Sequence, residues 1–123
     1  EYPMEACGLL GGRSGRATSH YPIANVAAEP ELRFEMDPNG QLDAFNRMRA
    51  RGEELVAIYH SHPRTSPVPS LSDIREAYYP EVCYVIVGLA GPRPQVRTFR
   101  IDRERGRAVE VRWTQVRGLA AKS

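Results

Sequence analysis

Two histidines, two residues apart, are the first residues in this chain whose types and spacing could do chemistry. His60 and His62 directly follow an apolar run, residues 55–59, that predicts a buried strand. Side chains two apart on a strand point to the same face, about 6.6 Å apart along the backbone. The pair can therefore converge on one metal ion.

A third ligand is needed for a catalytic zinc site, which uses three protein ligands and a water. The nearest downstream acid is Asp73, eleven residues after His62, beyond a loop that Pro67 and Pro69 stiffen. A strand end, a rigid loop and a helix start could bring this carboxylate back to the histidines. We therefore predict one Zn²⁺ per chain, held by His60, His62 and Asp73.

Ordinary structural roles are open for the same residues. A His-x-His pair on a strand is common in plain packing, and Ser70-x-x-Asp73 is also the pattern of a helix capping box. The Ser70 hydroxyl could instead face a developing oxyanion from a helix start. Spacing does not choose among these roles.

Hydrolysis also needs a carboxylate that takes a proton from water and passes it to the leaving nitrogen. Spacing does not select this residue among the remaining acids. Glu5 is the favoured candidate because it directly precedes a predicted strand, residues 6–13. A solvated surface acid is the alternative for any single glutamate.

The elements that must position these residues alternate between strand and helix. Residues 6–13 and 17–24 predict a hairpin around Ser14-Gly15, and residues 32–36 alternate as a half-buried strand does. The other predicted elements are a helix from Asp37-Pro38 to Gly52, a short helix over 71–79, and strands over 55–59, 82–89, 95–101 and 108–114. This order predicts an α+β fold with one mixed sheet flanked by helices.

Length and composition narrow the class of protein. A chain of 123 residues has room for one domain, expected over 1–116 with a flexible tail at 117–123. A net charge of +2, without a basic block, does not predict nucleic-acid binding. The longest apolar run, residues 82–90, is far shorter than the ~20 residues of a spanning helix, and no export signal is visible. Two cysteines, Cys7 and Cys83, suit buried thiols in a reducing cytoplasm.

The pattern as a whole resembles a known family. His60-Ser61-His62, then seven residues, Ser70, two residues and Asp73 follow an upstream Glu5 in Glu-Ala-Cys-Gly-Leu-Leu-Gly-Gly. This arrangement resembles the JAMM (MPN-plus, Mov34/PAD-1-like) zinc metallopeptidases from Glu5 to about Trp113. The resemblance implies a curved, barrel-like JAMM/MPN sheet, His60, His62 and Asp73 as zinc ligands, Glu5 as general base and acid, and Ser70 as oxyanion stabiliser.

The chain most resembles the small bacterial members of that family. These cut after the C-terminal Gly-Gly of ubiquitin-like sulfur-carrier proteins, including release of a cysteine built on that tail. The expected partner is therefore a ubiquitin-like or sulfur-carrier protein with a Gly-Gly tail, which an exposed sheet edge could hold as an added strand. Phe34 could flank the groove that would hold this tail, and Arg64 could meet a substrate carboxylate.

Two other functions remain alternatives. A non-catalytic, ubiquitin-like-protein-binding scaffold of the MPN-minus kind would have lost ligands, whereas this chain keeps the full set. A RadC-like DNA-associated protein carries a similar histidine pattern. The weak net charge and the lack of an additional helical DNA-binding segment make it the third interpretation.

Overall fold

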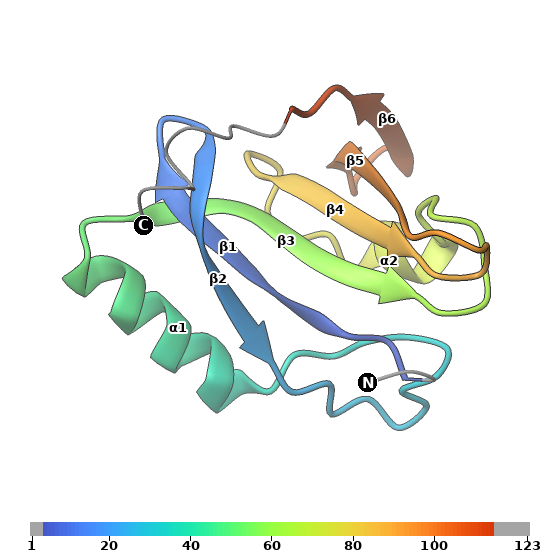
Figure 1. Ribbon diagram of the computed structural model, residues 1–123, viewed down its shortest axis with the longest axis horizontal. Coiled ribbons are helices and arrows are strands. Elements are labelled where there is room, and N and C mark those ends of the chain that lie inside the picture. The colour runs from blue at the N-terminus through green and yellow to red at the C-terminus, as the bar shows by residue number, and fades with distance from the viewer. Residues whose placement is uncertain (1–3, 115–123) are drawn as a thin grey trace.

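One open sheet and two helices make up the computed structural model, which describes residues 4–114 (Figure 1). The elements in chain order are β1 (Cys7–Arg13), β2 (Arg16–Ile23), α1 (Pro38–Ala50), β3 (Glu54–His62), α2 (Leu71–Arg75), β4 (Cys83–Gly88), β5 (Gln95–Asp102) and β6 (Arg107–Val111). The six strands lie in the order β2-β1-β3-β4-β5-β6, and only β3 and β4 are parallel. The predicted mixed α+β sheet is confirmed. It is not closed into a barrel, because β2 and β6 form its edges within the described part of the chain.

Helix α1 begins as its sequence predicts. The Asp37 carboxylate accepts a hydrogen bond from Gly40 N at 3.1 Å, and Pro38 occupies the first helical position, where its missing N–H is not needed. Ala44 and Met48 are buried against the sheet. The hairpin turn is also where it was predicted, with positive φ at Ser14 and Gly15.

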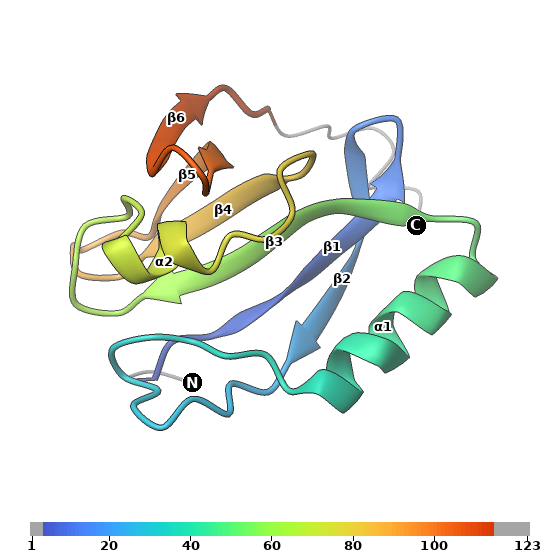
Figure 2. The same ribbon diagram turned by 180° about the vertical axis from the view of Figure 1, so that it is seen from behind.

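Both helices contribute to one hydrophobic core. Buried side chains of β1 to β5 pack with Ala44 and Met48 of α1, and Ile74 of α2 packs against the same cluster. Helix α2 lies behind the sheet in Figure 1 and in front of it in Figure 2. This packing fixes α2 beside the end of β3.

The strand register brings three chain segments together at that end. Cys7 of β1 pairs with His60 of β3, and His62 pairs with Gly88 of β4. The last residues of β3 therefore lie between the start of β1 and the end of β4.

Two predicted elements differ from the structure. Residues 32–36 are not a strand: Leu32 N and Arg33 N bond back to Glu29 O in a turn, and only Met36 forms an isolated bridge. Helix α2 ends at Arg75 rather than at residue 79, because the following backbone N–H groups bond to nearer carbonyls: Ala77 N donates to Ile74 O and Tyr78 N donates to Glu76 O. The expected tail, 117–123, lies outside the described residues. None of the helices within residues 4–114 is long and apolar enough to cross a membrane.

Candidate metal centre

The two motif histidines converge at the end of β3. Both lie on its core-facing side, and their side chains are almost completely buried, with His60 1% and His62 4% exposed. Their Nε2 atoms are 3.1 Å apart. The same-face prediction from the spacing is confirmed.

Asp73 completes the cluster from the first turn of α2. Its Oδ2 lies 3.1 Å from His60 Nε2 and 3.0 Å from His62 Nε2. The capping box is also present, because Ser70 N donates to Asp73 Oδ2 at 2.9 Å and Asp73 N donates to Ser70 Oγ at 3.0 Å. Capping and ligation are therefore compatible roles of one carboxylate, and the cap fixes its orientation.

The donor set fits a zinc ion. His62 Nδ1 lies 2.8 Å from the carbonyl oxygen of Ser66, which can only accept, so in the neutral imidazole the proton is on Nδ1 and Nε2 carries a lone pair. That lone pair faces the Asp73 carboxylate, and two acceptors at this distance repel each other unless a proton or a cation lies between them. Zinc bound at ~2.0–2.1 Å to each ligand suits donors that lie about 3 Å apart.

Glu5 stands beside the histidines because of the β1–β3 register. Ala6 N donates to Ser61 Oγ at 2.8 Å and Ser61 N donates to Ala6 O at 2.9 Å, which continues the pairing to the edge of the site. A carboxylate oxygen of Glu5 and ring nitrogens of His60 and His62 lie within 4.8 Å of one another. Glu5 is 5% exposed, and its Oε1 has no hydrogen-bond partner among the described residues.

Burial sets the electrostatics of the cluster. It raises the pKa of Glu5 from 4.5 to about 7, and the charge of His62 opposes this shift. Burial alone would also raise the pKa of Asp73, but hydrogen bonds from both histidines hold it well below its usual range. Burial lowers the pKa of His60. Asp73 therefore stays ionised, whereas the pKa of Glu5 lies near neutral pH. Two carboxyl groups with such different pKa values are what acid–base chemistry needs.

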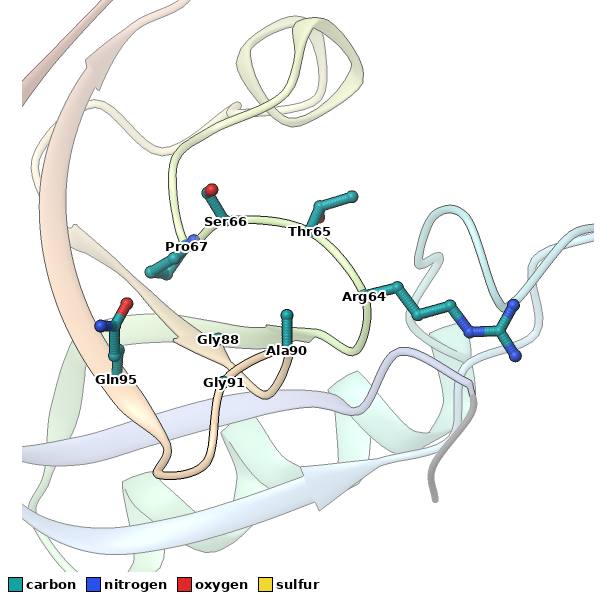
Figure 3. A pocket seen from close by; sticks show the side chains of 8 residues that line it. All are labelled: Arg64, Thr65, Ser66, Pro67, Gly88, Ala90, Gly91 and Gln95. Atoms are coloured by element: carbon teal, nitrogen blue, oxygen red, sulfur yellow. The ribbon is translucent and has the colours of Figure 1, made fainter.

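The remaining predicted site residues lie around this cluster. Phe34 is half-buried, and its ring stacks on the His60 imidazole with centroids 4.4 Å apart. Ser70 is exposed at the start of α2. Arg64 is exposed on the loop after β3, and Figure 3 shows its guanidinium extended away from the neighbouring pocket.

That pocket, of about 600 Å³, adjoins the loop that follows His62 in the chain (Figure 3). Its lining comes from the loop after β3, from the β4–β5 connection and from the strand ends on either side of that connection: Arg64, Thr65, Ser66, Pro67, Gly88, Ala90, Gly91 and Gln95. His62 directs Nδ1 to Ser66 of this loop and Nε2 to Asp73. The imidazole therefore connects this loop to the Asp73 carboxylate.

Two contributors to the site were not predicted from the sequence. Ser61, the residue between the histidines, holds the backbone next to Glu5. Finding it requires the register between β1 and β3. The Ser66 carbonyl orients His62, and a backbone carbonyl carries no sequence signal because every residue has one.

Comparisons with known proteins agree with this geometry. The family model described as prokaryotic homologs of the JAB domain matches residues 1–102. The desampylase of Haloferax volcanii is 40% identical over 68% of this chain and 62% of its own length, so the chain spans less than two thirds of that relative. The CysO-cysteine peptidase of Mycobacterium tuberculosis is 36% identical over 82% of this chain and 70% of its own.

A solved structure has the same fold. The solution structure of a Desulfitobacterium hafniense protein superposes with a TM-score of 0.77 at 39% identity, covering 89% of this chain and 77% of that one. The expected JAMM-type domain is confirmed. With the family match over most of its length, the chain belongs to the prokaryotic homologues of the JAB domain.

Proposed function

We propose that this chain is a zinc-dependent hydrolase of the JAMM type that cuts the peptide or isopeptide bond after the C-terminal Gly-Gly of a ubiquitin-like or sulfur-carrier protein. The main support for this proposal is the convergence of three atoms, His60 Nε2, His62 Nε2 and Asp73 Oδ2, which lie 3.0–3.1 Å from one another. A non-catalytic scaffold does not need such a cluster beside a buried glutamate.

His60, His62 and Asp73 would hold the zinc ion. When bound, zinc supplies a Lewis acid that polarises the scissile carbonyl and makes a water more acidic. The protein keeps these ligands rigid: β3 carries two, and the capping box orients the third. Burial of all three excludes bulk water and strengthens the local field.

Glu5 would act as general base and then as general acid. Burial raises the pKa of Glu5, which favours its accepting a proton from the attacking water before it gives that proton to the leaving amine. Its unpartnered Oε1 leaves an acceptor for that water. Ser70 would stabilise the oxyanion, because its Oγ accepts from Asp73 N and its own O–H proton remains available to donate.

Substrate recognition would involve the segment that carries Phe34. The names of two relatives, a desampylase and a CysO-cysteine peptidase, support a small modifier protein as substrate. A Gly-Gly tail can lie flat beside the Phe34 ring because glycine has no side chain. The exposed Arg64 would meet a carboxylate of the leaving group outside the pocket of Figure 3. Two cysteines, Cys7 and Cys83, are too few for a disulfide framework, which supports a reducing, cytoplasmic compartment.

The test is cleavage of a small ubiquitin-like protein with a C-terminal Gly-Gly-cysteine extension, and of a lysine-linked conjugate, by wild type and Glu5→Gln. Zinc content is measured on both samples. Cutting by wild type alone, with equal zinc in both, supports the hydrolase and the role of Glu5. If both hold zinc and neither substrate is cut, the proposed substrate class is wrong. If neither holds zinc, the scaffold function takes precedence.

A further inference from the structure

Asn25 has an unusually full set of hydrogen bonds for one side chain. It lies in the segment of residues 24–37, which joins β2 to α1. Its Nδ2 donates to the carbonyl oxygens of Glu5 (2.9 Å), Arg33 (3.1 Å) and Pro30 (3.3 Å), and its Oδ1 accepts from Ala27 N (3.0 Å) and Glu35 N (3.0 Å). A primary amide has two N–H donors and one oxygen with two lone pairs. Every donor and acceptor of Asn25 is therefore in use.

One part of this network fixes the backbone of Glu5 on both sides. Asn25 binds the Glu5 carbonyl, and Glu5 N donates to Pro30 O at 2.7 Å. The same Pro30 oxygen also accepts from Asn25, which closes a ring of contacts around Glu5. A carboxylate on such a backbone has few ways to move relative to β3.

The other part holds the backbone around Phe34. Asn25 binds Arg33 O and Glu35 N, the groups on either side of that residue. The Phe34 ring in turn stacks on His60. One amide thus connects the residue proposed as general base with the aromatic residue that covers a proposed zinc ligand.

We propose that Asn25 is a positioning residue that locks segment 24–37 to the Glu5 backbone, so that Glu5 and Phe34 are placed as one unit. This inference rests on the proposed hydrolase function. Catalysis is sensitive to such placement, because an error of about 1 Å can reduce a rate by about 10²-fold.

Only an amide makes all five contacts. Leucine at this position has a similar size and no polar atom, so it leaves three carbonyls and two N–H groups without their partner. Aspartate keeps both accepted bonds and loses the three donated ones. The pair Asn25→Leu and Asn25→Asp therefore separates the donating half of the side chain from the accepting half.

The experiment uses the full chain loaded with zinc. Asn25→Leu and Asn25→Asp are compared with Glu53→Leu, which removes another side chain with several hydrogen bonds. Glu53 lies directly before β3, at the opposite end of that strand from the site, and accepts hydrogen bonds from Thr18, Ser19 and Tyr21. The measurements are kcat and KM on the Gly-Gly-cysteine fusion, zinc content, and amide exchange of Glu5 and Glu35 by NMR.

Both Asn25 variants should keep one zinc and lose about 10²-fold in kcat. Exchange of the Glu5 amide should quicken by on the order of tenfold in both variants, and of the Glu35 amide in Asn25→Leu alone. Glu53→Leu should keep the wild-type kcat and the wild-type exchange at Glu5. These results together would support the proposal.

Three results would overturn it. An equal loss of kcat in Glu53→Leu would show a general effect of stability, and wild-type kcat in Asn25→Asp would show that the donated bonds do not place Glu5. If wild type cuts no fusion, the proposed function fails and the exchange rates decide alone. Unchanged amide exchange at Glu5 in Asn25→Leu would then overturn the proposal that Asn25 positions the Glu5 backbone.

Discussion

The Phe34 ring stacks on the His60 imidazole, with 4.4 Å between centroids and 23° between planes. His62 is oriented differently, by a hydrogen bond from Nδ1 to Ser66 O. His60 Nδ1 is buried and has no hydrogen-bond partner within residues 4–114. Packing by Phe34 therefore takes the place of the usual hydrogen bond that orients a metal-binding histidine.

Phe34→Ala should lower kcat/KM on a Gly-Gly fusion by about tenfold, largely through KM. An aromatic pair contributes roughly 0.5–1.5 kcal/mol beyond buried area, and the alanine also removes one wall of the proposed groove. Steady-state kinetics with zinc content measure the effect. Phe34→Tyr keeps the ring and serves as the control. Unchanged turnover in Phe34→Ala would remove this residue from the groove.

Three substitutions at Ser70 separate its capping role from its proposed catalytic role. Ser70→Ala should lower the free energy of unfolding by about 1 kcal/mol, because it removes the N-cap of α2. It should also lower kcat by about 10²–10³-fold, the usual effect of losing an oxyanion donor. Ser70→Asp keeps an N-cap acceptor without a hydroxyl, and Ser70→Thr keeps both.

The two roles of Ser70 predict different effects on stability and on kcat among the three variants. Chemical denaturation should show reduced stability only in Ser70→Ala, while kinetics should show reduced kcat in Ser70→Ala and Ser70→Asp. Normal kcat in Ser70→Asp would mean that Ser70 only caps α2.

Metal-free protein should lose stability as pH rises from about 4.5 to 7. Burial raises the folded pKa of Glu5 to about 7, so in this window the folded state keeps a proton that the unfolded chain has released. The stabilising contribution is complete below pH 4.5 and amounts to roughly 3 kcal/mol from a shift of this size. Urea denaturation with chelator present measures it.

Glu5→Gln is the matched variant, because glutamine has the same shape and does not titrate. Between pH 4.5 and 7, the free energy of unfolding of this variant should change less with pH than that of wild type, by the contribution of Glu5. His62 also has a raised pKa, to which the Glu5 charge contributes, so the difference between the two curves reports Glu5 together with its coupling to His62. Parallel curves would contradict the raised pKa.

Local patterns were enough to predict most elements and the convergence of His60, His62 and Asp73. Side-chain alternation put His60 and His62 on one face, and Asp37-Pro38 predicted the start of α1. The alternation at residues 32–36 was misleading, since the same pattern occurs where the backbone bonds to Glu29 O in a turn. The alternation did not predict burial there either, because Leu32 is 70% exposed. Strand pairing depends on the backbone partner, which periodicity does not identify.

Contacts across long sequence separations could not be predicted in this way. The residues Ala6 and Ser61 are 55 positions apart, and their contact depends on the register of two antiparallel strands. A shift of one residue would put Glu5 on the opposite face from the histidines. The resemblance to a family identified Glu5, but its burial and the raised pKa follow only from the three-dimensional structure.

Gly88→Ala should weaken zinc binding without changing any ligand. Gly88 pairs with His62, and a Cβ at this position would lie 2.9–3.0 Å from three ring carbons of Pro67. Pro67 is buried, so relief of this contact requires the loop to shift. The next residue back is Ser66, whose carbonyl orients His62. Loss of such an outer contact typically reduces metal affinity by about 10–100-fold.

Gly91→Ala is the control from the same pocket, because a Cβ there would meet only Arg93 O at 3.9 Å, an ordinary contact. Competition with a chelator gives the zinc affinity of both variants and of wild type. Weaker binding in Gly88→Ala alone would show that the Pro67 contact acts through Ser66 on the histidine. Equal affinity in all three proteins would mean that the loop absorbs the added methyl group, and that His62 is held by β3 rather than by the Ser66 carbonyl.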